Sequence, residues 1–390
     1  MVTILLIIIY LSFISLGLPD ALLGSAWPSM YEGLQVPMSY AGVISMLIAG
    51  GTIVSSLQSN RLIKKLGTGK VTAISVGITA TALFGFSISH SFLALCIWAI
   101  PYGLGAGSVD AALNNFVALH YKARHMSWLH CFWGVGATFG PYIMGFCLTG
   151  GMRWNSGYRI VFVIQMLLTV VLICTIPLWK KSSDRIQDVH KSHKNLRVKE
   201  LIQIPGAFFA LLAFFAYCSL EATTGLWGSI YMVKGRGISN EMAATWTSLF
   251  YLGITLGRFL SGFITMKLGD KKMIRLGQGI AVSGVLLLLL PAGDMILCIG
   301  FVSIGLGCAP IFPSLLHATP VHFGEELSQA IMGIQMACAY VGSTFMPPLV
   351  GLAVEHIHMK LYPLFLSALL LLMIIMVEKL NKKAKQHIVN

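Results

Sequence analysis

Three acidic residues lie where the surrounding sequence is apolar. Asp20 lies within an apolar run from Val2 to Met30, and Asp110 and Glu221 lie inside two further long apolar segments. An ionisable side chain at membrane depth costs at least about 3 kcal/mol, so such residues usually belong to ion or substrate pathways. The type and placement of these acids predict a protein that moves a solute across a membrane and uses protons to do so.

The two aspartates are the candidates for proton chemistry. Burial in a low-dielectric medium disfavours the charged form of a carboxyl group, so it can hold a proton and release it when water gains access. At about 1.5 Å rise per helical residue, Asp20 and Asp110 would lie on opposite sides of the membrane midplane. We predict that Asp110 is the coupled proton site and that Asp20 links protonation to solute binding. The alternative for either acid is a structural role, hydrogen-bonded to Asn114 or to a hydroxyl group.

The elements that position these residues are membrane-spanning helices. The chain has 390 residues, of which 56% are hydrophobic and 11% charged, whereas soluble domains are about 25% charged. Segments of about 20 apolar residues can cross a bilayer as helices. We predict twelve, at Val2–Met30, Tyr40–Leu57, Val71–Ser89, Leu93–Leu119, Trp128–Leu148, Ile160–Trp179, Ile204–Val233, Ala243–Met266, Gly277–Leu290, Met295–Leu316, Ala330–Val354 and Leu361–Val377. The fold class is therefore an all-α, multi-pass membrane protein.

The basic residues orient the chain. The formal net charge is +13, and most Lys and Arg residues fall in alternate loops, at 61–70, 122–124, 180–199, 267–275 and 379–385. This bias follows the positive-inside rule, which predicts that both termini are cytoplasmic. The excess of positive charge therefore indicates no nucleic-acid partner. The first segment lacks the features of a cleaved signal peptide, and the eight cysteines lack metal-ligand spacing, so we predict a retained first span and no metal site.

The chain divides into two similar halves. A polar stretch separates six predicted helices from six, which gives bundles at 1–179 and 201–379, a cytoplasmic linker at 180–200 and a tail at 380–390. Asp20-Ala-Leu-Leu-Gly matches Glu221-Ala-Thr-Thr-Gly, and glycines at 51, 67 and 103 match glycines at 253, 269 and 305 at one constant offset. Parallel repeats of this kind, with a solute site between the halves, are typical of major facilitator transporters.

Two loops carry a resemblance to that superfamily. Residues 60–70 read Asn-Arg-Leu-Ile-Lys-Lys-Leu-Gly-Thr-Gly-Lys, and the second half has Gly-Arg-x-x-x-Gly at 257–262 followed by Leu-Gly-Asp-Lys-Lys at 268–272. Both resemble the signature loop of the major facilitator superfamily, although the first lacks the usual leading Gly and the Asp. The resemblance implies two six-helix bundles and a cytoplasmic gate. The implied gating residues are Arg61, Lys65, Gly67, Lys70, Arg258, Asp270 and Lys271. The alternative is a basic loop that only fixes topology.

A narrower resemblance comes from the fourth predicted helix. Residues 105–117 read Gly-Ala-Gly-Ser-Val-Asp-Ala-Ala-Leu-Asn-Asn-Phe-Val. Together with Asp20, this segment resembles the fucose–galactose–glucose:proton symporters, which carry an Asp in helix one and an acid followed by Ala, Asn, Phe and Val in helix four. Asp110 replaces a Glu of that pattern, and Asn115 replaces a Pro. The resemblance implies proton-coupled symport of a sugar or a sugar-like solute.

A sugar site needs aromatic faces for the ring and polar groups for the hydroxyls. The candidate solute-binding residues are Asn114, Asn115, Glu221, Trp27, Trp133, Trp227, His130, Gln335 and Tyr340. The aromatic residues could instead anchor helix ends at the membrane interface. His130 is either a proton relay or a polar contact between helices. Glu221 binds a sugar hydroxyl, a cation or an amine, or else forms a hydrogen bond to Thr223 or Thr224.

Two other functions compete with sugar symport. A proton-coupled exporter of drugs or metabolites is favoured by Glu221 and by a Gly-Pro pair at 140–141, a motif associated with antiporters. A membrane sensor that binds without transporting is the third hypothesis. The sequence has no Walker loop, zinc motif or nucleophile elbow, so we predict neither an enzyme nor a cofactor. The expected partners are a small solute, protons and the lipids of the cell membrane. The pathway lies inside one chain, so we expect a functional monomer.

Overall fold

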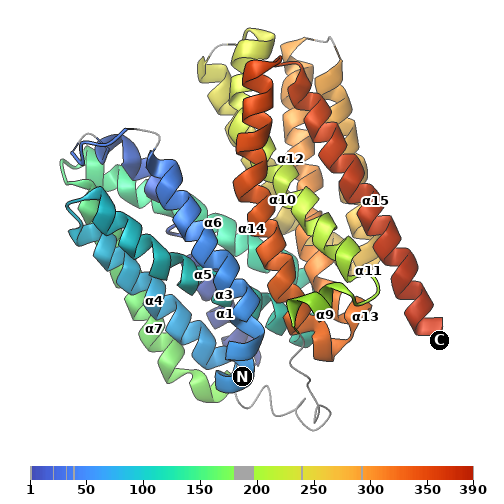
Figure 1. Cartoon of the computed structure of the whole chain (residues 1–390), viewed down its shortest axis with the longest axis horizontal. Helices are drawn as coiled ribbons and strands as arrows, with labels where there is room; N and C mark the ends of the chain where they lie inside the picture. The colour runs from blue at the N-terminus through green and yellow to red at the C-terminus, as the bar shows by residue number, and fades with distance from the viewer. Residues whose placement is uncertain are drawn as a thin grey trace. The chain divides into compact units, whose positions relative to one another are not determined.

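The structure, a computed structural model, describes residues 2–20, 22–31, 33–37, 40–179, 197–238, 240–290 and 293–389. Most of the predicted linker lies outside the described residues. Those that are described form helices and turns without strands (Figure 1). The elements are α1 (Val2–Gly17), α2 (Leu22–Ala26), η1 (Trp27–Ser29), α3 (Ala41–Leu66), α4 (Thr68–Ile88), α5 (Phe92–His120), α6 (Ala123–Thr149), α7 (Trp154–Cys174), α9 (Val198–Ile202), α10 (Ala207–Ile230), η3 (Tyr231–Gly235), α11 (Asn240–Leu289), α12 (Asp294–His317), α13 (Thr319–Phe323), α14 (Glu325–His356) and α15 (Leu361–Val389).

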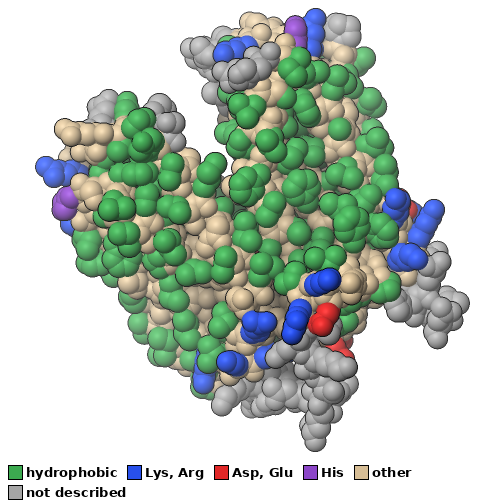
Figure 2. Space-filling view, viewed as in Figure 1, with side chains coloured by type: hydrophobic (Ala, Val, Ile, Leu, Met, Phe, Trp, Pro, Cys, Tyr) green, Lys and Arg blue, Asp and Glu red, His purple; other side chains and the backbone are tan. Residues whose placement is uncertain are grey.

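The described helices account for the expected spans. Eleven segments within the described residues are long and apolar enough to cross a membrane. One of them lies in α11, which consists of two helices joined at Gly269, where the backbone leaves the helical conformation. Counting both arms of α11 gives twelve spans, so the predicted all-α membrane fold is confirmed. Figure 2 shows hydrophobic side chains along the helices and Lys and Arg near their ends.

The chain forms two compact units. The first unit comprises Met1–Phe116 and Leu129–Asn195, and the second comprises Val117–Trp128 and Leu196–Asn390. In the first unit α4 packs against α7, and in the second α11 packs against α12 while α10 packs against α14 and α15. Residues 117–128 connect two helices of the first half but pack with the second unit. Trp128 contacts the ring of Phe263 and donates a hydrogen bond from Nε1 to the carbonyl oxygen of Phe259 at 3.3 Å.

The repeated glycines mark the same helix contact in each unit. A Cβ atom on Gly103 would lie 2.9 Å from the carbonyl carbon of Ile48, and one on Gly305 would lie 3.1 Å from the carbonyl carbon of Phe250. Only glycine allows two helix backbones to approach this closely. Ile48 and Gly103 hold the positions in the first half that Phe250 and Gly305 hold in the second. The sequence repeat is therefore also a repeat of helix packing.

The two signature loops share a backbone turn. Gly67 has φ 81° and ψ 156°, and Gly269 has φ 72° and ψ 163°. Positive φ values of this kind strongly favour glycine, which has no Cβ atom. In both units a single glycine therefore ends one spanning helix and begins the next. The remaining signature residues are held at the ends of α3 and α4, or at the centre of α11.

Candidate functional site

Asp20 lies at an interruption of the first membrane span. The helix α1 ends at Gly17 and α2 begins at Leu22, so the expected continuous helix from Val2 to Met30 is broken. Tight turns bridge the gap, because the Asp20 amide donates to the Gly17 carbonyl at 3.2 Å and the Leu22 amide donates to the Pro19 carbonyl at 3.1 Å. Discontinuous spans of this kind are a common way to build solute sites in transporters.

Two neutral donors from neighbouring helices hold the Asp20 carboxylate. Trp133 on α6 donates from Nε1 to Oδ2 at 2.8 Å, and the hydroxyl of Tyr102 on α5 donates to Oδ1 at 3.4 Å. The Asp20 side chain is exposed, whereas Tyr102 is buried. An exposed carboxylate with an indole and a phenol beside it can accept further hydrogen bonds. Trp133 on the fifth span and Asp20 on the first are thus brought together at the interruption.

Asp110 lies deeper in the first unit. It is 7% exposed, and its Oδ1 accepts a hydrogen bond from Nδ2 of Asn114, one turn later on α5, at 2.8 Å. The Asn114 Oδ1 atom lies 3.0 Å from Nε2 of His130 on α6. Since the Asn114 amide group donates to Asp110, its oxygen faces His130 and can accept a hydrogen bond from an Nε2–H group. The chain Asp110–Asn114–His130 is therefore a polar contact between α5 and α6.

The second unit contains a different acidic cluster. Oε2 of Glu221 on α10 accepts a hydrogen bond from the Tyr217 hydroxyl and lies 3.3 Å from Nη2 of Arg258 on α11. Arg258 is 4% exposed. The predicted gating residue Arg258 is therefore paired with the predicted solute-binding residue Glu221. The hydroxyl of Thr224, considered above as a partner of Glu221, instead donates to the Leu220 carbonyl at 2.7 Å.

Other predicted solute-binding residues lie within the packing of each unit. Trp27 is buried in an apolar core with Met144 and Tyr158. Trp227 donates from Nε1 to the Pro347 carbonyl at 2.8 Å, which ties α10 to α14. The buried Gln335 accepts a hydrogen bond from the Thr319 hydroxyl at 3.1 Å. Asn115 is buried and Tyr340 is half-buried.

The predicted gating residues divide between the two signature loops. In the first loop, Lys65 and Lys70 are exposed, and Arg61 donates to Gln58 on its own helix at 3.4 Å. In the second loop, Lys271 is half-buried, and Asp270 Oδ2 lies 2.7 Å from Nδ1 of His317 at the end of α12. His317 was not among the predicted site residues. A histidine at the end of a long apolar segment was its only signal.

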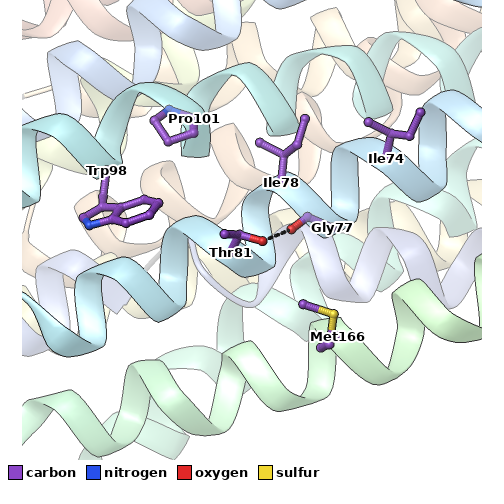
Figure 3. Close-up of a pocket in the computed structure, with 7 residues that line it drawn as sticks. All are labelled: Ile74, Gly77, Ile78, Thr81, Trp98, Pro101 and Met166. Atoms are coloured by element: carbon purple, nitrogen blue, oxygen red, sulfur yellow. Dashed lines mark hydrogen bonds between the residues drawn. The ribbon is translucent and has the colours of Figure 1, made fainter.

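One pocket among the described residues is apolar. It has a volume of about 470 Å³ and lies among α4, α5 and α7, lined by Ile74, Gly77, Ile78, Thr81, Trp98, Pro101 and Met166 (Figure 3). The Thr81 hydroxyl donates to the Gly77 carbonyl of its own helix at 2.8 Å. The pocket therefore contributes almost no hydrogen-bonding capacity, and none of the predicted site residues lines it.

A helical membrane fold with repeated halves, an interrupted first span and acids on its first and fourth spans is typical of a secondary transporter. The Major Facilitator Superfamily model matches residues 9–239 and 209–387. The chain therefore belongs to the Major Facilitator Superfamily of transporters, as its sequence motifs indicated.

Three proteins to which the chain is similar share 14–21% of its sequence. The chain is 21% identical over 389 residues to Bypass of stop codon protein 6 of Saccharomyces cerevisiae, covering 90% of this chain and 77% of that protein. It is 21% identical over 356 residues to the glucose/mannose transporter GlcP of Bacillus subtilis, covering 88% and 86%. The crystal structure of the transporter FucP in the outward conformation matches with a TM-score of 0.78 at 14% identity, over 96% of this chain and 97% of FucP. At this identity the likeness to FucP shows the fold alone.

Proposed function

We propose that this transporter carries a sugar or sugar-like solute together with protons, by alternating access. The observation that carries the proposal is the environment of Asp20. Its exposed carboxylate lies at a helix interruption and is held by the Trp133 indole and the Tyr102 hydroxyl. A carboxylate can accept sugar hydroxyl groups, and an adjacent aromatic ring can cover the apolar face of a pyranose. The relative named glucose/mannose transporter supports this solute class.

The two aspartates have different roles in this proposal. Asp110 is the coupled proton site, since it is buried and its carboxylate is hydrogen-bonded to Asn114. Asp20 links protonation to solute binding, because it is exposed and shares its oxygens with donors on two other helices. The gating roles of the two signature loops belong to the same proposal. We further propose that the protein works as a monomer in the cell membrane, with both termini in the cytoplasm.

A proton-coupled exporter is the second candidate, and one observation favours it. Pro141 lies inside α6, and a Cβ atom on the preceding Gly140 would collide with the Leu18 carbonyl oxygen. The Gly-Pro pair thus packs directly against the interruption that contains Asp20. In an exporter the same acids would exchange protons for the solute.

Proton movement in proteoliposomes distinguishes the two candidates. The purified protein is reconstituted without an imposed gradient, and external pH is recorded as single sugars are added. Symport predicts sugar-dependent alkalinisation of the medium, which Asp110→Asn abolishes, while exchange of labelled sugar across the membrane persists because exchange needs no net proton movement. Absence of any response to sugars, with proton release on adding a lipophilic cation, would establish the exporter instead.

A further inference from the structure

The second unit contains a cluster that the proton chemistry of the first unit does not use. Tyr217, Glu221 and Gly225 are spaced four residues apart and share one face of α10. Tyr251, Thr255 and Arg258 share a face of α11 at offsets of four and seven residues. Arg258 and Glu221 pair across these faces, and a Cβ atom on Gly225 would collide with the Tyr251 hydroxyl oxygen. The two faces therefore meet along two successive turns.

Glu221 is paired with a buried cation. Arg258 is almost fully buried and the Glu221 side chain is 22% exposed, so the pair lies in a medium where a lone charge would be costly. A proton taken up by Glu221 would leave the Arg258 guanidinium buried without a counterion. Glu221 therefore serves as the counterion of Arg258, whereas the donors to Asp20 are neutral.

The Oε1 atom of Glu221 is able to accept further hydrogen bonds. Both described contacts of this carboxylate, from Tyr217 and Arg258, end on Oε2. Oε1 accepts none of the hydrogen bonds among the described residues, although each carboxylate oxygen can accept two. Tyr251 is 50% exposed, and its hydroxyl group packs against Gly225, one helical turn after Glu221, so it places an aromatic ring and a hydroxyl group near this carboxylate.

We propose that Glu221 and Tyr251 form a half-site for a neutral polyhydroxy solute. Oε1 accepts one solute hydroxyl, the Tyr251 hydroxyl forms a hydrogen bond with another, and the Tyr251 ring covers an apolar face. Arg258 and Tyr217 are positioning residues that hold the carboxylate. Because Glu221 and Arg258 neutralise each other, the half-site does not favour an organic cation. This inference rests on the proposed function and deepens it, since it assigns solute recognition without proton transfer to the second unit.

Hexose binding and proton movement are measured separately on the purified full-length protein. The probes are D-glucose, D-mannose and L-fucose, with tetraphenylphosphonium as the cationic probe. Glu221→Gln weakens the hydrogen bond to the solute and is expected to raise the hexose Kd about tenfold, and Tyr251→Phe about fivefold. The number of protons moved per hexose stays at the wild-type value in both variants. Tyr142→Phe, at a 72% exposed tyrosine of α6, is the matched control and leaves the Kd unchanged.

Tyr251→Phe serves as the control for a folding defect in Glu221→Gln. Glu221→Gln leaves Arg258 buried beside a neutral group and could unfold the unit, whereas Tyr251→Phe removes one hydroxyl from an exposed side chain. Unchanged hexose affinity in folded Tyr251→Phe and Glu221→Gln would overturn the half-site while symport stands. Weakened hexose binding in both, in a wild type that moves no protons, would support the half-site and reject proton coupling. Binding of tetraphenylphosphonium without hexose binding would reject both. Loss of proton movement in Glu221→Gln with hexose affinity unchanged would reject the half-site alone, because it would assign proton coupling to Glu221.

Discussion

Replacing Gly136 with alanine should separate α6 from α1 next to the Asp20 site. A Cβ atom at Gly136 would lie 2.9 Å from the carbonyl carbon of Ile14 and 3.0 Å from the amide nitrogen of Leu18. These are backbone atoms, so relief requires movement of a whole helix. Overpacking of this kind costs about 1–3 kcal/mol. Because Trp133 precedes Gly136 by one helical turn, the same movement should lengthen its 2.8 Å hydrogen bond to Asp20.

The same helix provides a matched control. A Cβ atom at Gly145 of α6 meets no atom within 4 Å, and a Gly-to-Ala change at a compatible helical site stabilises a protein by about 0.4–1 kcal/mol. At about 2–4 °C per kcal/mol for a unit of this size, Gly136→Ala should lower Tm by about 2–12 °C and Gly145→Ala should raise it by about 1–4 °C.

The assay is thermal unfolding in detergent, followed by solute binding at a temperature where both variants are folded. Gly136→Ala should also weaken solute binding, whereas Gly145→Ala should not. Equal Tm values and equal solute affinities for the two variants would refute the close contact of α6 with α1, and with it the geometry that brings Trp133 to Asp20.

Two further predictions concern single side chains. Trp133→Phe should raise the solute Kd about tenfold, because it removes a 2.8 Å hydrogen bond to a carboxylate. Tyr102→Phe should raise the solute Kd only about twofold, because its hydrogen bond is 3.4 Å long. Binding titrations measure both Kd values, and a larger effect of Tyr102→Phe would show that Tyr102 is the main support of Asp20. Burial, with a smaller effect of Lys271, lowers the pKa of His322 on α13 despite the opposing charge of Asp270. The folded state therefore binds fewer protons at this residue than the unfolded state, so its contribution to stability is present above pH ~6.5 and is lost as the pH falls below that value. Unfolding scans from pH 7.5 to 5 should show a smaller loss of Tm in His322→Gln than in the wild type, and identical losses would contradict the burial of His322.

The membrane spans were predictable because the hydrophobicity of many residues adds up along each of them. Each contains about 20 apolar residues, and no single position decides the result. The interruption at Asp20 was not predicted, since it depends on how the backbone groups freed around Pro19 find partners. That information lies in the packing of Gly136 and Gly140 against Leu18, contacts more than a hundred residues distant in sequence.

Pairing was harder to predict than burial. Both Glu221 and Arg258 were chosen as functional residues, yet they were assigned to different functions because their helices and faces could not be related from sequence. The position of Arg258 in the sequence was nevertheless a signal for this ion pair. Arg258 lies within an apolar segment, and a guanidinium at that depth requires an acidic partner. Tyr102 and Tyr217 carried no comparable signal, because a tyrosine in a span is equally consistent with packing or anchoring.

The two repeats combine the same packing with different electrostatics. Corresponding glycines bring corresponding helices together in both units, and Asp20 and Glu221 occupy matching positions of the repeat. Asp20 is held by an indole and a phenol, whereas Glu221 is held by a guanidinium and a phenol. Protonating the first carboxylate leaves no buried cation behind, and protonating the second leaves one. Divergence of the partners, rather than of the acids, therefore distinguishes the two halves, and under the proposed function it assigns proton exchange to the first half and solute binding to the second.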